Sequence, residues 1–179
     1  MNEKKKIFAI VGSASRHSAN QKLVDQFISL TNDDFAVMQW DDLKRLPPFD
    51  LEQSIDSPPE IIRQFRGAIQ QADGLLICTP EYVFSIPSGL KNAIEWCVAT
   101  TVFSGKPVGL ITASANGEKG HEELQLIMRT VMAKFSEETV LWIRGIKGKI
   151  NEQGELTDSK TRDDLHTFIE AFKKEVRSI

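Results

Sequence analysis

The segment VGSASRHSAN, residues 11–20, carries an unusual density of small hydrogen-bond donors. It follows a short apolar run and leads into a stretch with helical periodicity. A phosphate group needs donors that converge on one point, and a helix N-terminus offers free N–H groups and a favourable dipole. An ordinary capped loop would need only Ser18. We therefore expect this loop to bind an organic phosphate through residues such as Gly12, Ser13, Ser15, Arg16, Ser18 and Asn20.

This loop differs from the common nucleotide-binding motifs. Only Gly12 is a glycine, so the loop is not the dinucleotide pattern G-x-G-x-x-G, and it lacks the G-K-[ST] of a P-loop. A response regulator that accepts a phosphoryl group would need acidic residues at the end of the first strand. The residues there are Val11, Gly12 and Ser13, which excludes that class.

A second unusual segment is TPEYVFSIPSGLKNAIEW, residues 79–96. Its two prolines restrict the backbone on either side of an apolar loop. Tyr82 and Phe84 offer planar surfaces to a ring system, and the N–H groups between them can meet the polar edge of a heterocycle. In an alternative reading, Tyr82, Phe84 and Ile86 fill a subunit interface. The two uses can coexist.

The remaining chemically active residues form no recognisable catalytic set. Glu81 is a candidate general acid, or it holds its loop in place. The three histidines are scattered without metal-ligand spacing, and His17 either contacts phosphate or is a solvated loop residue. Cys78 and Cys97 lie in apolar surroundings that are typical of reduced core cysteines.

Apolar runs of strand length alternate with segments of helical period along the whole chain. This alternation predicts an α/β fold, with a doubly wound five-stranded parallel sheet and helices on both faces. Ligands of such sheets bind beyond the carboxyl ends of the strands, so the loops 13–20, 80–88 and 115–120 should share one site. The expected strands are 6–12, 35–40, 74–80, 106–114 and 138–144, and the expected helices are 18–30, 57–72, 88–100, 121–135 and 163–176.

Two of these helices begin with capping signals. Ser18 with Gln21 three residues later is a capping-box pattern. Ser57 is the expected cap of the next helix, with a proline at its first position and Glu60 at its third. The polar stretch 41–57 between them is expected to be a surface loop.

Length and composition favour one domain over residues 1–179, with 41% hydrophobic residues for its core. The net charge of −3 and the lack of a basic stripe argue against nucleic acid as a partner. No apolar segment approaches the about 18 residues of a membrane span, and the N-terminus lacks a signal-peptide core. We therefore expect a cytoplasmic protein.

The stretches GSASRHSANQKL, TPEYVFSIPSGLKNAIEW and GKPVGLITAS together resemble the NADPH-dependent FMN reductase family, which has azo-, quinone- and chromate-reducing members. The resemblance runs from the first strand to the last helix. It implies a flavodoxin-like fold, FMN as cofactor and NADPH or NADH as hydride donor. The acceptor would be a small soluble molecule, namely a flavin, quinone, azo compound or metal oxyanion. Family members pair as homodimers, and some form homotetramers.

The resemblance also assigns the residues of the site. Ser13, Ser15, Arg16, Ser18, Asn20 and Gln21 would cradle the FMN phosphate. Pro80, Glu81, Tyr82, Val83 and Phe84 would line the isoalloxazine ring, and Ser114, Ala115, Asn116 and Gly117 would close its other edge.

Two positions depart from the family pattern, which usually has Asn in place of Val83 and Gly in place of Ser88. Val83 removes a side-chain amide, so backbone N–H groups must carry more of the contact with the polar edge of the flavin. No catalytic side chain is required, because hydride transfer through the flavin N5 belongs to the cofactor. Backbone N–H groups near 82–84 and 115–117 would stabilise negative charge on the reduced ring.

Two alternatives to a reductase stay open: an FMN-binding electron carrier, and a scaffold of the same fold that has lost its flavin. Carriers usually have a Thr-rich phosphate loop and a strongly acidic surface, and this chain has neither. Lys91 and Asn92 are expected to anchor the helix behind the ring. For a subunit contact the candidates are Phe84, Ile86, Trp96 and Val102, although Trp96 could equally be a plain core residue.

Overall fold

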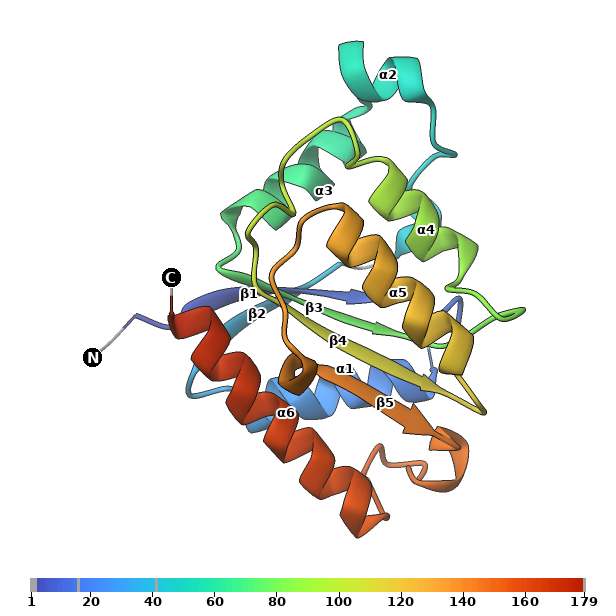
Figure 1. The fold of residues 1–179 in the computed structure, drawn as a ribbon, viewed down its shortest axis with the longest axis vertical. Helices are drawn as coiled ribbons and strands as arrows, with labels where there is room; N and C mark the ends of the chain where they lie inside the picture. Colours follow the sequence, from blue (N-terminus) through green and yellow to red (C-terminus); the bar gives the residue numbers. More distant parts are fainter. Residues whose placement is uncertain (1–2, 16, 41, 179) are drawn as a thin grey trace.

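The computed structural model describes residues 3–15, 17–40 and 42–178. Its centre is a five-stranded sheet in the order β2-β1-β3-β4-β5, in which every pair of neighbouring strands is parallel (Figure 1). This confirms the doubly wound, flavodoxin-like α/β fold. The strands are β1 (Lys5–Val11), β2 (Phe35–Gln39), β3 (Gly74–Thr79), β4 (Val108–Ser114) and β5 (Val140–Arg144).

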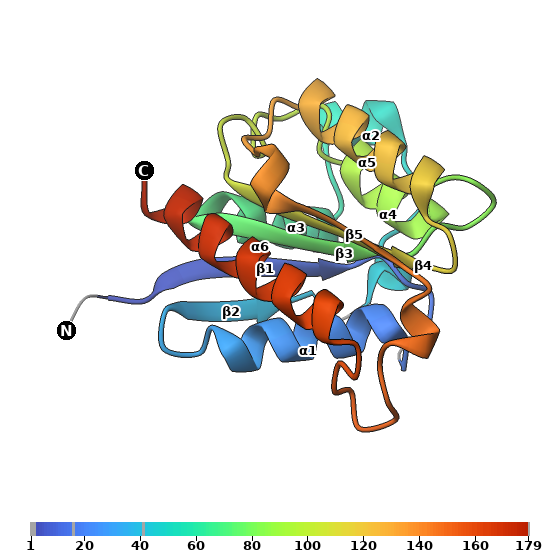
Figure 2. The same ribbon diagram turned by 60° about the horizontal axis from the view of Figure 1, so that its bottom comes forward.

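Helices cover both faces of the sheet, as Figure 2 shows from a second side. This is why all six residues of β3 are buried and why its sequence reads as an unbroken apolar run. One face carries α1 (Ala19–Leu30) and α6 (Ser159–Arg177). The other face carries α3 (Glu60–Gln71), α4 (Ser88–Glu95) and α5 (Glu118–Thr130).

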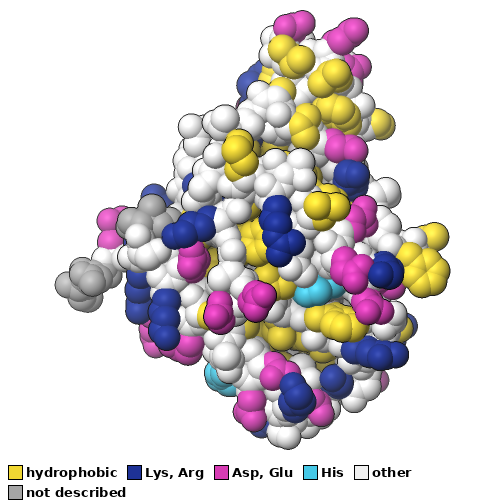
Figure 3. Space-filling view, viewed as in Figure 1, with side chains coloured by type: hydrophobic (Ala, Val, Ile, Leu, Met, Phe, Trp, Pro, Cys, Tyr) yellow, Lys and Arg dark blue, Asp and Glu magenta, His cyan; other side chains and the backbone are white. Residues whose placement is uncertain are grey.

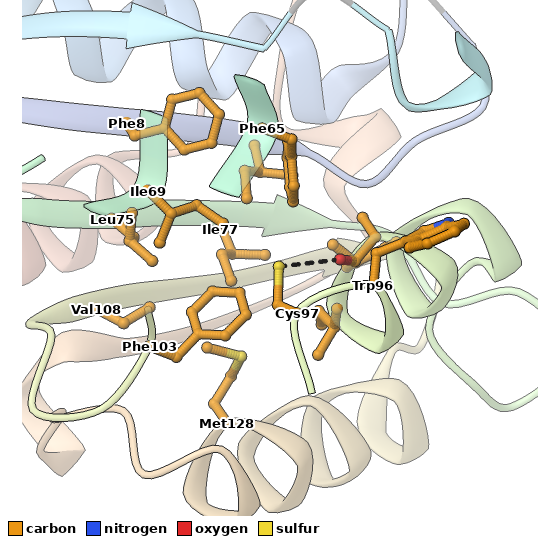
Figure 4. Close-up of a cluster of buried hydrophobic side chains, with 14 of the residues drawn as sticks. Phe8, Phe65, Ile69, Leu75, Ile77, Trp96, Cys97, Phe103, Val108 and Met128 are labelled. Atoms are coloured by element: carbon orange, nitrogen blue, oxygen red, sulfur yellow. Dashed lines mark hydrogen bonds between the residues drawn. The ribbon is translucent and has the colours of Figure 1, made fainter. Parts of the chain in front are cut away.

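Alternation along the strands divides the interior into two cores. In β1, Phe8 and Ile10 face α3 and α4, while Ile7 and Ala9 face α1 and α6. Figure 4 shows the first of these cores, where Phe8 meets the ring of Phe65 edge-on at 5.7 Å between ring centroids. The two cores hold the strands in place, and the loops that follow these strands leave from the carboxyl edge of the sheet.

The helix expected over 57–72 starts later than predicted, and the assignment of Ser57 as its cap was wrong. The helix begins at Glu60, after Pro59, without a side-chain cap bond. Ser57 instead ends a short helix, α2 (Leu51–Asp56), which Asp50 caps by accepting from the N–H of Gln53. The stretch 41–57 is therefore not a plain loop. Prolines after Ser57 separate the two helices because the residue before a proline avoids helical backbone.

Other element ends also differ from expectation. The capping box at α1 is half formed: Ser18 accepts from the N–H of Gln21 at 3.1 Å, but the Gln21 side chain bonds Asp25 and Gln39 instead. The helix expected over 88–100 already ends at Glu95. The next one begins at Glu118 rather than 121, because Gly117 starts it with a left-handed φ of 86°.

Gly12 allows the first loop to leave the sheet. Its N–H donates to the carbonyl of Cys78 at 2.8 Å, which keeps it against β3. A Cβ at this position would lie 2.3 Å from the Thr79 Oγ1 atom and 3.0 Å from a methyl group of Leu90. Only glycine therefore fits where β1 passes β3 and α4.

None of the helices within the described ranges combines the length and the apolar character that spanning a membrane requires.

Gly12→Ala should lower the free energy of unfolding by about 1–3 kcal/mol, the usual cost of forcing a methyl group into packed atoms. Urea denaturation followed by far-UV circular dichroism measures this. The matched control is Gly67→Ala in α3, where a Cβ meets nothing within 4 Å. That control should gain about 0.5–1 kcal/mol, because alanine favours a helix interior. Equal effects of the two substitutions would contradict the steric argument.

Candidate functional site

A cavity of about 700 Å³ opens at the carboxyl edge of the sheet, where the loops after β1, β3 and β4 meet. It lies where strand order reverses, since the chain moves from β1 to β2 on one side and to β3 on the other. Its volume is within the range of small-molecule sites, about 300–1,000 Å³. Of the predicted residues, it brings together Ser13, Ser15, Ser18, Asn20, Pro80, Tyr82, Ser114 and Ala115.

A second hollow, of about 630 Å³, lies between α1, α6 and the segment 153–156. It is lined by charged side chains of both signs, including Asp25, Glu155 and Arg162. None of the three predicted loops reaches it, so the strand-edge cavity is the better candidate site.

The first loop presents its hydroxyl groups where α1 begins. The Ser15 N–H donates to the Ser13 Oγ atom at 3.2 Å, and Ser18 caps the helix. The Ser13 Oγ atom lies 3.4 Å from the hydroxyl of Tyr82, so the first loop meets the loop after β3 directly. Arg16, which the sequence placed in this cradle, lies outside the described residues.

Asn20 is a buried positioning residue. Its side-chain Nδ2 donates to the carbonyl of Ala113 at 3.1 Å, and its Oδ1 accepts from the Cys78 thiol at 3.4 Å. It thus joins α1 to β3 and β4. Gln21 lines a different, smaller hollow and exchanges two side-chain hydrogen bonds with Gln39, at 2.9 and 2.8 Å.

The two cysteines are sealed in the core. Burial raises the pKa of the Cys78 thiol far above its usual value and that of Cys97 to about 12, so both stay protonated thiols. Within residues 3–15, 17–40 and 42–178, no group of His, Cys, Asp or Glu side chains could hold a metal ion.

The loop after β3 ends in a tight turn. Tyr82 and Ser85 exchange backbone hydrogen bonds of 2.8 and 3.1 Å, and both residues between them are left-handed, Val83 with φ 53° and Phe84 with φ 59°. Turns of this kind favour Asn, Asp and Gly, and a β-branched residue is the least suited to them. Val83 is 94% exposed and Phe84 is 75% exposed. Replacing the usual Asn of the family by Val83 therefore removes a side-chain amide and also places a poorly suited residue in left-handed backbone.

Two carboxylates fasten this loop to α5. Glu81 accepts from the N–H of Gly120 at 2.9 Å, so it holds the loop, which is the second of the roles considered for it. Glu123 accepts from the Ser85 hydroxyl at 2.6 Å and from the N–H of Ile86 at 2.9 Å. The sequence gives no signal for Glu123, because its contact joins residues almost forty positions apart.

The loop after β4 is held from β5 and α5. The Trp142 indole N–H donates to the carbonyl of Asn116 at 2.7 Å, and a Cβ on Gly117 would lie 3.1 Å from the indole nitrogen. His121 stacks on the Trp142 ring, and its Nδ1 lies 2.9 Å from the buried Thr112 hydroxyl. Burial lowers the pKa of His121, and the neighbouring Glu122 opposes this only in part.

The remaining wall of the cavity comes from residues that the sequence analysis did not predict to be site residues. For one of them, His17, the sequence left a phosphate contact and a solvated position open. After β5, the short helical turn Ile146–Gly148 and the following residues complete the rim. The only available signal was topological, since the loop after β5 also leaves the carboxyl edge of the sheet. These lining residues are His17, Ala19, Lys22, Ala113, Ile146, Lys147 and Ile150.

Two of the residues suggested for a subunit contact are core residues of this chain. Ile86 is 3% exposed, so its assignment to a subunit contact was wrong, and Trp96 is fully buried, as the core alternative for that residue expects. The apolar ring of Trp96 fills the space between α4 and the preceding segment, and its indole N–H donates to the carbonyl of Pro47. Asn92 anchors α4, as expected: it accepts from the N–H of Phe49 at 2.7 Å and donates to Pro47 at 2.9 Å.

Comparison with known proteins identifies the family. The model of the NADPH-dependent FMN reductase family matches residues 5–143. A 2-hydroxy-1,4-benzoquinone reductase of a Burkholderia species is 34% identical, over 96% of both chains, and a quinone reductase of Escherichia coli K12 is 30% identical, over 100% of this chain and 99% of the relative. The solved flavoenzyme NAD(P)H:(acceptor) oxidoreductase of Paracoccus denitrificans superposes with a TM-score of 0.83 at 24% identity, covering 97% of this chain and 98% of that one. The chain therefore belongs to the NADPH-dependent FMN reductase family, which confirms the expectation of an oxidoreductase that uses FMN and NAD(P)H.

Proposed function

We propose that this protein transfers a hydride from NAD(P)H, through the N5 atom of bound FMN, to a small soluble acceptor, with quinones as the first class to test. The observation that carries the proposal is the cavity in which the three loops of the carboxyl edge meet. The two relatives named quinone reductases support the choice of acceptor. Free flavins, azo compounds and metal oxyanions are the further candidates.

The lining of the cavity fits the two ends of FMN. The hydroxyl groups of Ser13, Ser15 and Ser18 at the start of α1 suit a phosphate, because free N–H groups and the helix dipole favour an anion there. The flat end would lie against Pro80 and Tyr82, whose apolar surfaces suit a ring. When bound, FMN supplies the redox chemistry by accepting and passing on a hydride.

The protein's own part is to bind and orient. We assign the phosphate to the first loop, with Asn20 as the residue that holds this loop to the sheet. The loop over 114–117 would face the polar edge of the ring and leads into the N-terminus of α5, which favours negative charge. The assignment as a whole covers Ser13, Ser15, Arg16, Ser18, Asn20, Gln21, Pro80, Glu81, Tyr82, Val83, Phe84, Ser114, Ala115, Asn116 and Gly117.

We further propose that the 179 residues act as one FMN-binding domain in a cytoplasmic homodimer or homotetramer. The support for self-association is the exposed apolar tip formed by Val83 and Phe84, next to the cavity. Hydrophobic atoms project at the right-hand edge of the molecule in Figure 3, where this turn lies. Sedimentation velocity tests the proposal, and a monomer at micromolar concentration would refute it.

The purified chain should bind FMN and oxidise NAD(P)H when an acceptor is present. Flavin fluorescence titration measures the binding, and nicotinamide absorbance measures turnover with a quinone, riboflavin, an azo dye or chromate. NADPH and NADH are compared as donors. FMN binding without nicotinamide oxidation would point to an electron carrier. No FMN binding at all would point to a scaffold that has lost its flavin.

Ser15→Asp tests where the phosphate binds. Ser15 is exposed and lines the cavity, so the new charge should repel the phosphate and weaken FMN binding by about tenfold to a hundredfold. Riboflavin lacks the phosphate, and its affinity should hardly change. Ser104→Asp, on an exposed loop after α4, is the control for the added charge. Equal losses for FMN and riboflavin would place the phosphate elsewhere.

A further inference from the structure

The turn over 82–85 is held in a conformation that its own residues disfavour. Val83 and Phe84 both have left-handed φ angles, and Val83 is β-branched. Such conformations are energetically unfavourable and persist only where the surrounding structure imposes them. The Val83 side chain makes little packing contact that would offset this cost, since it is almost fully exposed. The two backbone bonds between Tyr82 and Ser85 close the turn, and contacts from outside it can add to them.

Glu123 on α5 contacts the end of the turn. One oxygen of its carboxylate accepts from both the Ser85 hydroxyl and the Ile86 N–H. Hydrogen bonds to a charged acceptor are stronger than neutral ones. The first turns of α5 lie beside this projecting turn in both ribbon views (Figures 1 and 2). Glu81 fixes the other end of the loop on the same helix, through Gly120.

Tyr82 connects this turn to the cavity, because it belongs to the turn and also lines the cavity. The Tyr82 residue forms one side of the turn, through its two backbone bonds with Ser85, and its hydroxyl lies 3.4 Å from the Ser13 Oγ atom of the phosphate loop. If the turn relaxed, Tyr82 would move relative to Ser13 and the rest of the first loop. A carboxylate on α5 is thus connected to the wall of the cavity.

We propose that Glu123 is a positioning residue, which holds the left-handed turn in place and thereby sets the cavity wall at Tyr82 for FMN. The proposal rests on the proposed function in that FMN is the ligand of this cavity. Glu123 touches no reacting group. Its effect is on the geometry with which the cavity receives the ring.

A stability cycle tests the proposal without any flavin. Val83→Asn should raise the melting temperature, because Asn adopts left-handed backbone more readily than Val. In a Glu123→Ala background the turn is free to relax, and the same substitution should give at most half of that rise. Glu122→Ala is the control, because Glu122 is exposed on the same helix and pairs with Lys119 at 2.8 Å. An equal rise in all backgrounds would overturn the proposal.

FMN titration provides the second measurement. Glu123→Ala should weaken FMN binding by about tenfold, and Glu122→Ala should bind as the wild type does. Glu123→Gln should recover part of the loss, because its amide oxygen can still accept from the Ser85 hydroxyl and the Ile86 N–H but carries no charge. If the wild type binds FMN and Glu123→Ala binds it equally well, the proposal is refuted. If the wild type binds no FMN, the proposed function fails, and the stability cycle alone decides whether Glu123 holds the turn.

Discussion

The buried amide of Asn20 is the interaction on which the arrangement of the site depends. It lies at the start of α1 and bonds the carbonyl of Ala113 on β4 and the thiol of Cys78 on β3. Because the amide is buried, loss of either partner would leave a polar group unsatisfied, at a cost of about 1–3 kcal/mol. These bonds tie the start of the first helix to β3 and β4. The loops that follow those strands are placed with it.

The fold follows from features that the sequence displays locally. Unbroken apolar runs mark strands such as β3, which is buried on both faces, and helical periodicity marks the segments between them. The errors arose where two local signals competed. Ser57 fits the start of one helix and the end of another, and the outcome was decided by Asp50, which caps α2. For Trp96 the sequence left a partner contact and a core position equally open, and tertiary packing decides for the core.

The sequence allowed a prediction of which loops form the site, but not of the contacts that hold these loops in place. Ser13, Ser15, Tyr82 and Ala115 line one cavity because each follows a parallel strand at the same edge of the sheet. The groups that hold these loops are different, since they act across long sequence separations. Glu123 reaches the turn from α5, and neither its residue type nor its spacing indicates this. The left-handed backbone at Val83 could likewise not be predicted from the sequence, because a β-branched residue disfavours that conformation.

The bond between Trp142 and the loop after β4 gives the protein an intrinsic optical reporter. Its indole is partly exposed, in contrast to the fully enclosed ring of Trp96, and its N–H is bonded to the backbone of Asn116. Emission from Trp142 will therefore respond to the polarity and the motion of that segment. Conformational events in the loop after β4, whose Ser114 and Ala115 line the cavity, become observable in the unlabelled molecule, on the timescale of a stopped-flow mixing experiment.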